Sequence, residues 1–267
     1  MDLGLKGKVA LIAGASHGIG LATAHCLAQE GVHLILCSRN YDELLKAENN
    51  LVEKYDITVV IYPVDTISRK GVTETFAQIS QRLNRIDILV NAIGGAEKFG
   101  DFFDLTEKDW QNAYTLNVMS AEYFCHETVP WLIKAGGGRI INIASISGRT
   151  PGWFNPHYAA SKAALISLTK YLATKLASQN ILVNAICPST LSGYGFDRNA
   201  QDRATRDGIS LTEARQKMLA EGIKKSPLGR IGTEEDVAQL ITFLASDKAN
   251  YITGECINID GGITRSI

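Results

Sequence analysis

Short runs of apolar residues alternate along the chain with longer segments in which apolar and polar residues recur at helical spacing. The apolar runs are continuous, which is typical of strands buried on both faces of a parallel sheet. They are Val9–Ile12, Val32–Cys37, Val59–Tyr62, Ile88–Val90, Arg139–Ile143, Leu182–Ile186 and Cys256–Ile259. The helix-like segments between them are Ile19–Glu30, Tyr41–Lys54, Ser68–Leu83, Glu107–Ala135, Pro156–Ser178 and Glu234–Ser246.

This repeated strand–helix alternation predicts the fold class. It indicates an α/β protein with a Rossmann-type, doubly wound parallel sheet and helices on both faces. We expect about seven strands in the order 3-2-1-4-5-6-7, which extends the usual order of this architecture. No repeat, linker or shift of composition marks a boundary, so we expect one domain over residues 1–267.

One polar and charged segment, residues 191–226, interrupts the alternation after the sixth strand. Within it Ser210–Glu221 has a helical pattern, with Ser210 as N-cap and Glu213 completing a capping box. A long excursion at the carboxyl end of a strand in such a sheet is typical of a substrate lid. We therefore expect residues 191–226 to be a lid inserted in the domain.

The composition excludes several classes of protein. The chain has 267 residues, 45% of them hydrophobic, which excludes a disordered protein, and a net charge of -1, which argues against nucleic-acid binding. The first apolar run is too short for a secretory signal or a membrane helix, so we expect a soluble, cytoplasmic protein. The odd number of widely spaced cysteines favours buried free thiols in a reducing compartment. They are Cys26, Cys37, Cys125, Cys187 and Cys256.

A glycine-rich loop follows the first predicted strand and precedes the first predicted helix. It has the spacing G-x-x-x-G-x-G, with Gly14, Gly18 and Gly20 separated by Ser16, His17 and Ile19 among others. Such glycines permit a tight turn and a close approach of backbone N–H groups, and a helix N-terminus favours a pyrophosphate. The position of the loop therefore predicts a dinucleotide site.

The end of the second strand decides which nicotinamide cofactor is preferred. An acidic residue there would bind the 2′-hydroxyl of the adenine ribose and repel a 2′-phosphate, but the sequence reads Ser38-Arg39-Asn40 after Cys37. Ser38 leaves room for a phosphate and Arg39 provides a permanent charge with a donor fork suited to it. We expect NADP(H) to be preferred, with NAD(H) as the alternative.

Two Tyr-x-x-x-Lys pairs occur in one predicted helix, Tyr158 with Lys162 and Tyr171 with Lys175. Each pair shares a helix face, but the thirteen residues between them rotate an ideal helix by about 220°, so only one pair can line a given site. Strand five ends in Ser145, which puts a hydroxyl at a strand carboxyl end, where such sheets bind ligands. We therefore assign Tyr158 and Lys162 to the site, with the ammonium lowering the phenol pKa so that Tyr158 exchanges a proton with a substrate oxygen.

Taken together, these motifs resemble the short-chain dehydrogenase/reductase family over nearly the whole chain. The resemblance implies hydride transfer involving nicotinamide, a catalytic tetrad of Asn117, Ser145, Tyr158 and Lys162, and no metal. It also implies that Tyr158 and Lys162 contact the cofactor. Further cofactor contacts are implied for Asp65, Thr66, Asn91, Ala92, Ile93, Gly94, Pro188, Ser189 and Leu191, in addition to the glycine loop and residues 38–40.

The family resemblance also implies a homotetramer, formed by the helices at Glu107–Ala135 and Pro156–Ser178, whose apolar residues Tyr123, Phe124 and Leu168 we expect at the surface. Trp153, Phe154 and Tyr194, together with Ser145 and Tyr158, predict an apolar pocket for a small or medium ketone.

The sequence therefore favours an NADPH-dependent oxidoreductase acting on a small-molecule ketone or secondary alcohol. The second hypothesis is a 3-oxoacyl-(acyl carrier protein) reductase, to which the chain has its nearest resemblance. Five acidic residues of the lid offset most of its seven basic residues, which makes docking of an acidic carrier protein the less favoured case. A nucleotide-binding protein without turnover is a third hypothesis, because a fold alone does not establish catalysis.

Overall fold

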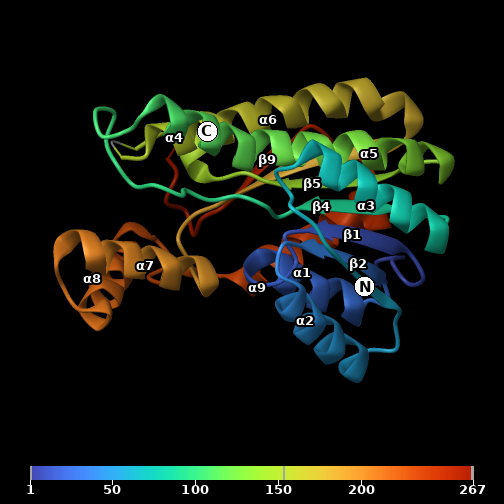
Figure 1. Cartoon of the computed structure of the whole chain (residues 1–267), viewed down its shortest axis with the longest axis horizontal. Helices are drawn as coiled ribbons and strands as arrows, with labels where there is room; N and C mark the ends of the chain where they lie inside the picture. The colour runs from blue at the N-terminus through green and yellow to red at the C-terminus, as the bar shows by residue number, and fades with distance from the viewer. Residues whose placement is uncertain (1, 153, 266–267) are drawn as a thin grey trace.

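The computed structural model describes residues 2–152 and 154–265 and is built around one parallel sheet with helices on both faces (Figure 1). The sheet has seven strands in the order β3-β2-β1-β4-β5-β6-β9, all parallel. The predicted fold class and strand order are therefore confirmed. The strands are β1 (Val9–Ala13), β2 (His33–Ser38), β3 (Val59–Pro63), β4 (Ile88–Asn91), β5 (Gly138–Ile143), β6 (Ile181–Pro188) and β9 (Cys256–Ile259).

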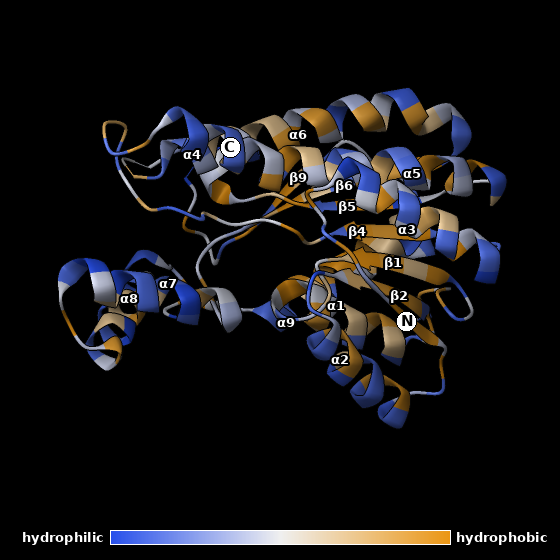
Figure 2. Cartoon of the chain, in the orientation of Figure 1, coloured by the Kyte–Doolittle hydropathy of each residue, from blue (hydrophilic) through white to orange (hydrophobic). Residues whose placement is uncertain are grey.

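Two helical layers enclose the sheet, and each covers its own apolar core. Helices α1 (Gly18–Gln29), α2 (Tyr41–Lys54) and α9 (Glu234–Ala245) pack on one face, where Leu27, Leu44 and Ile241 are fully buried. Helices α3 (Arg69–Arg82), α5 (Ser120–Lys134) and α6 (Pro156–Leu176) pack on the other. Figure 2 shows apolar strands between two layers of helices whose outer faces are polar. Because helices cover both faces of the sheet, the strand sequences are continuously hydrophobic.

The helix predicted over Glu107–Ala135 is interrupted. It consists of α4 (Glu107–Tyr114), a π-helical turn at Thr115–Met119, and α5. Asn117 lies in that turn, and its Nδ2 donates to the carbonyl of Ala113 at 2.9 Å, four residues back. A side chain that takes this acceptor competes with the regular helical hydrogen bond, which accounts for the local change of winding. Phe124, expected at the surface, is instead fully buried against Phe76 of α3.

Residues after β6 form a separate lobe made of α7 (Tyr194–Asp207) and α8 (Leu211–Lys225), which projects beside the body in Figure 1. Two short strands, β7 (Leu191–Ser192) and β8 (Gly232–Thr233), pair with each other at its base. Helix α7 was not predicted. Ser210 caps α8 as expected by accepting from the backbone N–H of Glu213, but the Glu213 carboxylate pairs with Lys217 at 2.8 Å rather than completing the capping box. The role of this lobe as a lid stays a prediction.

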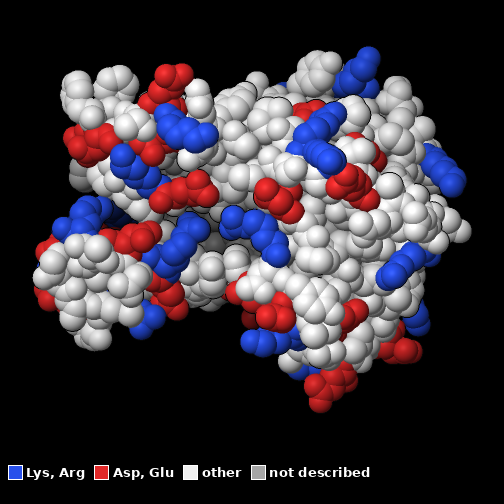
Figure 3. Space-filling model, viewed as in Figure 1, with Lys and Arg blue, Asp and Glu red and all other residues white. Residues whose placement is uncertain are grey.

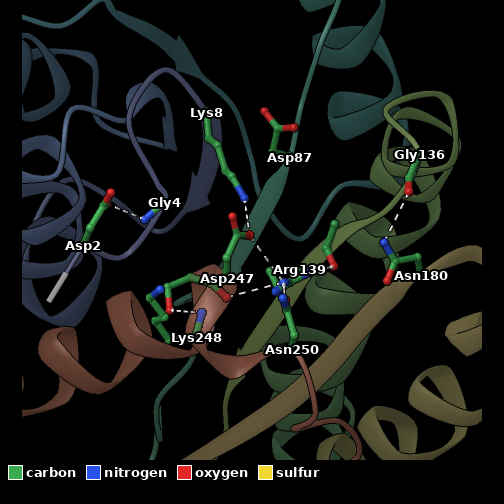
Figure 4. Close-up of polar contacts among 12 residues, drawn as sticks. Asp2, Gly4, Lys8, Asp87, Gly136, Arg139, Asn180, Asp247, Lys248 and Asn250 are labelled. Atoms are coloured by element: carbon green, nitrogen blue, oxygen red, sulfur yellow. Dashed lines mark hydrogen bonds and ion pairs between the residues drawn. The ribbon is translucent and has the colours of Figure 1, made fainter.

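The end of the sheet opposite the lobe is held by a polar network (Figure 4). Arg139, at the amino end of β5, is buried and donates to the carbonyl of Ser246 and to Oδ1 of Asn250, just beyond α9. Its guanidinium lies 3.8 Å from the Asp247 carboxylate, which also pairs with Lys8 at 2.7 Å. These charges fasten the end of α9 to the sheet and lie away from the carboxyl ends of the strands.

All five cysteines are unpaired by disulfides, and two of them, Cys26 and Cys256, are only half-buried rather than buried as expected. In the part of the chain that the structure describes, no helix is both long and apolar enough to span a bilayer. Among the same residues, no group of three or more His, Cys, Asp or Glu side chains is arranged to hold a metal ion.

Candidate active site

A cavity of about 450 Å³ opens at the carboxyl ends of β1, β4, β5 and β6 and is bordered by α7 and α8. Figure 3 shows the molecule hollowed between the α7–α8 lobe and the body, with acidic and basic side chains around the hollow. The loops after four strands meet here because parallel strands present the same end to one edge of the sheet. This is where open α/β sheets bind ligands.

The glycine loop shapes one end of this cavity. Gly14 and Gly18 have φ angles of 86° and 62°, which favour glycine. A Cβ on Gly20 would lie 2.0 Å from the carbonyl oxygen of Gly14, so the turn is too tight for any side chain there. His17 is the N-cap of α1 but makes no side-chain cap, which leaves the first N–H groups of the helix for a ligand. This cradle fits the pyrophosphate of a dinucleotide.

The end of β2 lies beside the loop. Ser38 is buried and its hydroxyl donates to that of Ser16 at 3.0 Å, while Arg39 is exposed and forms no ion pair with a described carboxylate. Asn40 caps α2 by accepting from the N–H groups of Asp42 and Glu43. The chain thus places a small hydroxyl and a cation where an acidic residue would exclude a 2′-phosphate.

At the centre of the cavity, Asn117 secures the backbone after β4. Its Oδ1 accepts from the N–H of Gly95 at 2.9 Å and its Nδ2 donates to the Gly95 carbonyl at 3.0 Å. Gly94 is packed so closely that a Cβ there would lie 2.7 Å from both Asn117 Oδ1 and Lys162 Nζ. Asn117 therefore positions the cavity wall from behind rather than lining it.

Ser145, Tyr158 and Lys162 all line the cavity. The Ser145 hydroxyl, just after β5, accepts from the backbone N–H of Ser147, and it lies close enough to the Tyr158 phenol to act on its pKa. Lys162 lies one turn after Tyr158 on α6, and its Nζ donates to the carbonyl of Ile143 at 2.7 Å. The Lys162 Nζ is 5.8 Å from the centroid of the Tyr158 ring. The three side chains predicted to act together are therefore brought together, whereas Tyr171 of the second pair is 65% exposed and lies outside the cavity.

The predicted effect of Lys162 on Tyr158 is not seen. Burial raises the pKa of Tyr158, and the Ser145 hydroxyl and the charge of Arg198 oppose that rise only in part. Burial also lowers the pKa of Lys162 to about 8. The reason is that the low-polarity site disfavours the charged form of both groups, and the ammonium is turned toward Ile143. Tyr158 is thus a protonated phenol at neutral pH.

The pocket wall is partly aromatic, as expected. Phe154 and Tyr194 line the cavity, Phe154 stacks against Phe99, and the Tyr194 ring stacks on His17 with centroids 3.6 Å apart. Trp153, the third aromatic residue expected here, lies outside the described residues. The stack of Tyr194 on His17 joins the start of α7 to the glycine loop.

Several predicted cofactor residues lie away from the cavity wall. The Nδ2 of Asn91 donates to Asn142 Oδ1 and to Cys125 Sγ, and its Oδ1 is buried without a partner among the described residues, so the side chain is turned into the protein and not toward the cavity. Asp65 is exposed after β3 and accepts from the N–H of Ile67, and Thr66 is buried. The predicted residues that do line the wall are His17, Gly18, Ile19, Ala92, Ile93, Gly94, Tyr158, Lys162, Pro188, Ser189 and Leu191.

Six charged or polar residues of the cavity lining were not predicted from the sequence: Ser147, Asn155, Thr190, Arg198, Asn199 and Glu234. The Glu234 carboxylate accepts from the backbone N–H of Tyr194 at 2.9 Å, beside Gly18, and burial raises its pKa. Arg198 and Asn199 sit in the lobe whose helix was not predicted. The charge of Arg198 and its position shortly after the predicted cofactor contacts Pro188, Ser189 and Leu191 were the available signal, but nothing local distinguishes Arg198 from a residue of a solvated helix face.

A doubly wound sheet, a glycine cradle for a dinucleotide, and a Ser, Tyr and Lys at one cavity define a nucleotide-dependent oxidoreductase. A family model described as "Enoyl-(Acyl carrier protein) reductase" matches residues 14–264. A 3-oxoacyl-(acyl-carrier-protein) reductase of Thermotoga maritima is 37% identical over 264 residues, covering 97% of this chain and 98% of the relative. D-beta-hydroxybutyrate dehydrogenase of Rhizobium meliloti is 32% identical over 260 residues, and the match covers 96% of this chain and 98% of that relative.

Solved structures agree. L-sorbose reductase from Gluconobacter frateurii, complexed with NADPH and L-sorbose, superposes with a TM-score of 0.93 at 33% identity over 100% of both chains. The chain belongs to the short-chain dehydrogenase/reductase family. It is an oxidoreductase of that family, with a site for a nicotinamide cofactor and a small-molecule substrate.

Proposed function

We propose that this protein is an NADPH-dependent reductase of small or medium ketones. The observation that carries the proposal is the convergence of Ser145, Tyr158 and Lys162 on a cavity that also includes the glycine loop. The overall reaction converts a ketone, NADPH and a proton into a secondary alcohol and NADP⁺. When bound, the cofactor supplies the hydride.

The residues of the chain supply the rest of the chemistry. Ser145 donates a hydrogen bond to the ketone oxygen, and Tyr158 gives that oxygen its phenolic proton as the hydride arrives at carbon. The raised pKa of Tyr158 suits this direction, because the phenol is protonated at neutral pH before substrate binds. Lys162 lies beside Gly94 and Tyr158, where it would hold the ribose hydroxyls of the nicotinamide half. Asn117 keeps Gly95, and with it the cavity wall, in place.

The preference for NADPH rests on the end of β2. Ser38 and the exposed Arg39 replace an acidic residue, and a guanidinium is well suited to a phosphate. The NADPH of the L-sorbose reductase complex supports the same preference. Steady-state kinetics with both cofactors tests it, and a KM for NADH equal to or below that for NADPH would overturn it.

The reaction class is tested by NADPH oxidation at 340 nm with a panel of free ketones and diketones. Tyr158→Phe should abolish turnover and leave NADPH binding intact, since it removes only the proton donor. Tyr171→Phe, in the second pair on the same helix, is the matched control and should retain nearly full turnover. Loss of turnover in Tyr171→Phe with full activity in Tyr158→Phe would refute the assignment.

A 3-oxoacyl-(acyl carrier protein) reductase is the second candidate, favoured by the 37% identical relative from Thermotoga maritima. Acetoacetyl thioester, with and without carrier protein, belongs in the same panel. Strong turnover of the thioester that rises further with the carrier would replace the free-ketone proposal.

A homotetramer is part of the first proposal and is supported by large exposed apolar side chains, such as Tyr171 and Tyr251. A monomeric mass by light scattering would refute it.

A further inference from the structure

Arg198 is the feature of the cavity that the proposed chemistry leaves without a role. It lies one turn into α7, at the mouth of the cavity, and its guanidinium reaches across to the loop after β4. A Cβ on Gly95 would lie 2.6 Å from Nη2 of Arg198 and 3.4 Å from Nη1. Gly95 is the residue that Asn117 holds by two hydrogen bonds, so the guanidinium lies against the stretch of cavity wall that Asn117 supports.

The other arginines of α7 are neutralised within the lobe. Arg203 pairs with Asp207 and Glu221, and Arg206 pairs with Asp207 and lies over the Phe154 ring. Within residues 2–152 and 154–265, Arg198 has neither a hydrogen bond nor an ion pair. Arg198 is exposed to solvent, and a guanidinium that lines a cavity without a protein partner is free to pair with an anion that enters the cavity.

The surroundings of Arg198 favour an anion on the substrate side. The carboxylate that lines the same cavity, Glu234, is bound to the backbone of Tyr194 beside Gly18, at the cofactor-loop end. The charge of Arg198 acts on Tyr158 and lowers its pKa, in agreement with a position close to the reacting phenol. Next to it, Asn199 has a buried Oδ1 with no partner among the described residues, so this part of the wall is polar and unsatisfied.

From these contacts we infer that Arg198 binds a carboxylate of the substrate, and that the substrate is therefore a small oxo acid rather than a neutral ketone. The inference rests on the proposed function and narrows its substrate class. The ketone oxygen lies at Ser145 and Tyr158, and the carboxylate accepts two N–H bonds from the fork of Arg198. A cavity of about 450 Å³ lies within the range of sites for small ligands, which suits a small acid.

The test uses pairs of substrates that differ in charge and by one methyl group. Acetoacetate and levulinate are compared with their methyl esters, and pyruvate with methyl pyruvate, by kcat/KM at saturating NADPH in the wild-type enzyme and variants. We expect the wild type to prefer the acid of at least one pair. Arg198→Met should lower kcat/KM for that acid by about 10- to 100-fold, the range for a lost hydrogen bond to a charged group, and change the ester less than about twofold. The kcat/KM of Arg198→Lys for the acid should lie between the values of the wild type and of Arg198→Met.

Arg215→Met is the matched control. Arg215 is exposed on α8, pairs with Asp197 and does not line the cavity, so its loss removes one positive charge from the same lobe. This variant should keep the preference for the acid. An equal loss in Arg215→Met and Arg198→Met would show that only the overall charge of the lobe matters, and would overturn the inference.

Other outcomes separate this inference from the proposed function. Turnover of neutral ketones without turnover of any oxo acid overturns the inference and leaves the reductase proposal standing. An unchanged acid preference in Arg198→Met with a raised KM for NADPH would make Arg198 a ligand of the cofactor phosphates, which also overturns it. Silence toward every ketone and acid, with NADPH bound, would refute the reductase proposal itself.

Discussion

Lys162→Met should abolish turnover and yet make the folded protein more stable at neutral pH. Lys162 is 2% exposed, and burial lowers its pKa from 10.5 to about 8. The folded protein therefore carries at pH 7 an ammonium that would be better solvated in the unfolded chain. Methionine has a similar length and no charge, so it removes this cost while filling the same space.

The magnitude follows from the two pKa values. A group with a pKa of about 8 in the folded state and 10.5 in the unfolded chain costs about 3 kcal/mol of stability at pH 7. Methionine also loses the hydrogen bond from Nζ to the carbonyl of Ile143, which offsets about 1 kcal/mol. The net expectation is a gain of about 2 kcal/mol, or about 4 °C or more in Tm.

The pH dependence gives the sharper test, because the sign is specific to a base with a lowered pKa. Between pH 8 and 10.5 the Lys162 amine is protonated in the unfolded chain and deprotonated in the folded protein. The free energy of unfolding of the wild type therefore rises with pH in this range. The extra stability of Lys162→Met over the wild type is therefore largest below about pH 8 and decreases above it. Between pH 7 and pH 9.5 it should fall by about 2 kcal/mol.

Urea denaturation of the cofactor-free protein at pH 7.0, 8.5 and 9.5 measures these differences. Lys175→Met, an exposed lysine on the same helix, is the control and should differ little from the wild type at every pH. Lower stability of Lys162→Met than of the wild type at pH 7 would show that the buried ammonium does not destabilise the fold. A difference between the two proteins that does not change with pH would show the same.

Three further substitutions test other parts of the structure. Glu234→Gln removes a negative charge beside the glycine loop and should tighten NADPH binding about three- to tenfold at pH 8 by calorimetry, whereas unchanged affinity would place the phosphates elsewhere. Arg139→Met should lower the free energy of unfolding by about 2–4 kcal/mol, because Arg139, unlike Lys162, offsets its burial with several partners, and the change leaves the buried Ser246 carbonyl, the Asn250 amide oxygen and the Asp247 carboxylate without it; KM values should stay the same, and altered KM values would contradict its purely structural role. Gly20→Ala forces the glycine loop apart and should weaken NADPH binding at least about 100-fold in a fluorescence titration, whereas Gly152→Ala, with open space around it, should bind normally.

Much of the fold could be predicted because its signals are local. The buried strands of a parallel sheet need apolar residues on both faces, so each strand appears in the sequence as a short continuous run, and each predicted run coincides with a strand of the sheet to within one or two residues at its ends. The glycine loop is equally local, because the tight approach of Gly20 to Gly14 involves residues six positions apart. The choice of Tyr158 over Tyr171 also needed only helix geometry and the end of β5.

The parts that could not be predicted depend on residues far apart in the chain. Arg198 meets Gly95 across about a hundred residues, and helix α7, which carries it, has too few apolar positions to give a clear periodic pattern. The π-helical turn at Asn117 exists because that side chain bonds to Gly95 and Ala113 at once. The burial of Phe124 likewise depends on α3 packing against α5.

The sequence by itself determined the sheet, its helical layers, the dinucleotide loop and the residue types of the reacting group, because each of these follows from neighbours within a few positions. Only the tertiary structure decided the protonation states of Tyr158 and Lys162 and the position of the Arg198 charge near them. Burial holds Tyr158 as a phenol and brings Lys162 to a pKa of about 8, whereas the spacing of the two residues suggested a lowered phenol pKa. Desolvation depends on everything packed around a side chain, and that environment is assembled from segments that the linear pattern keeps apart.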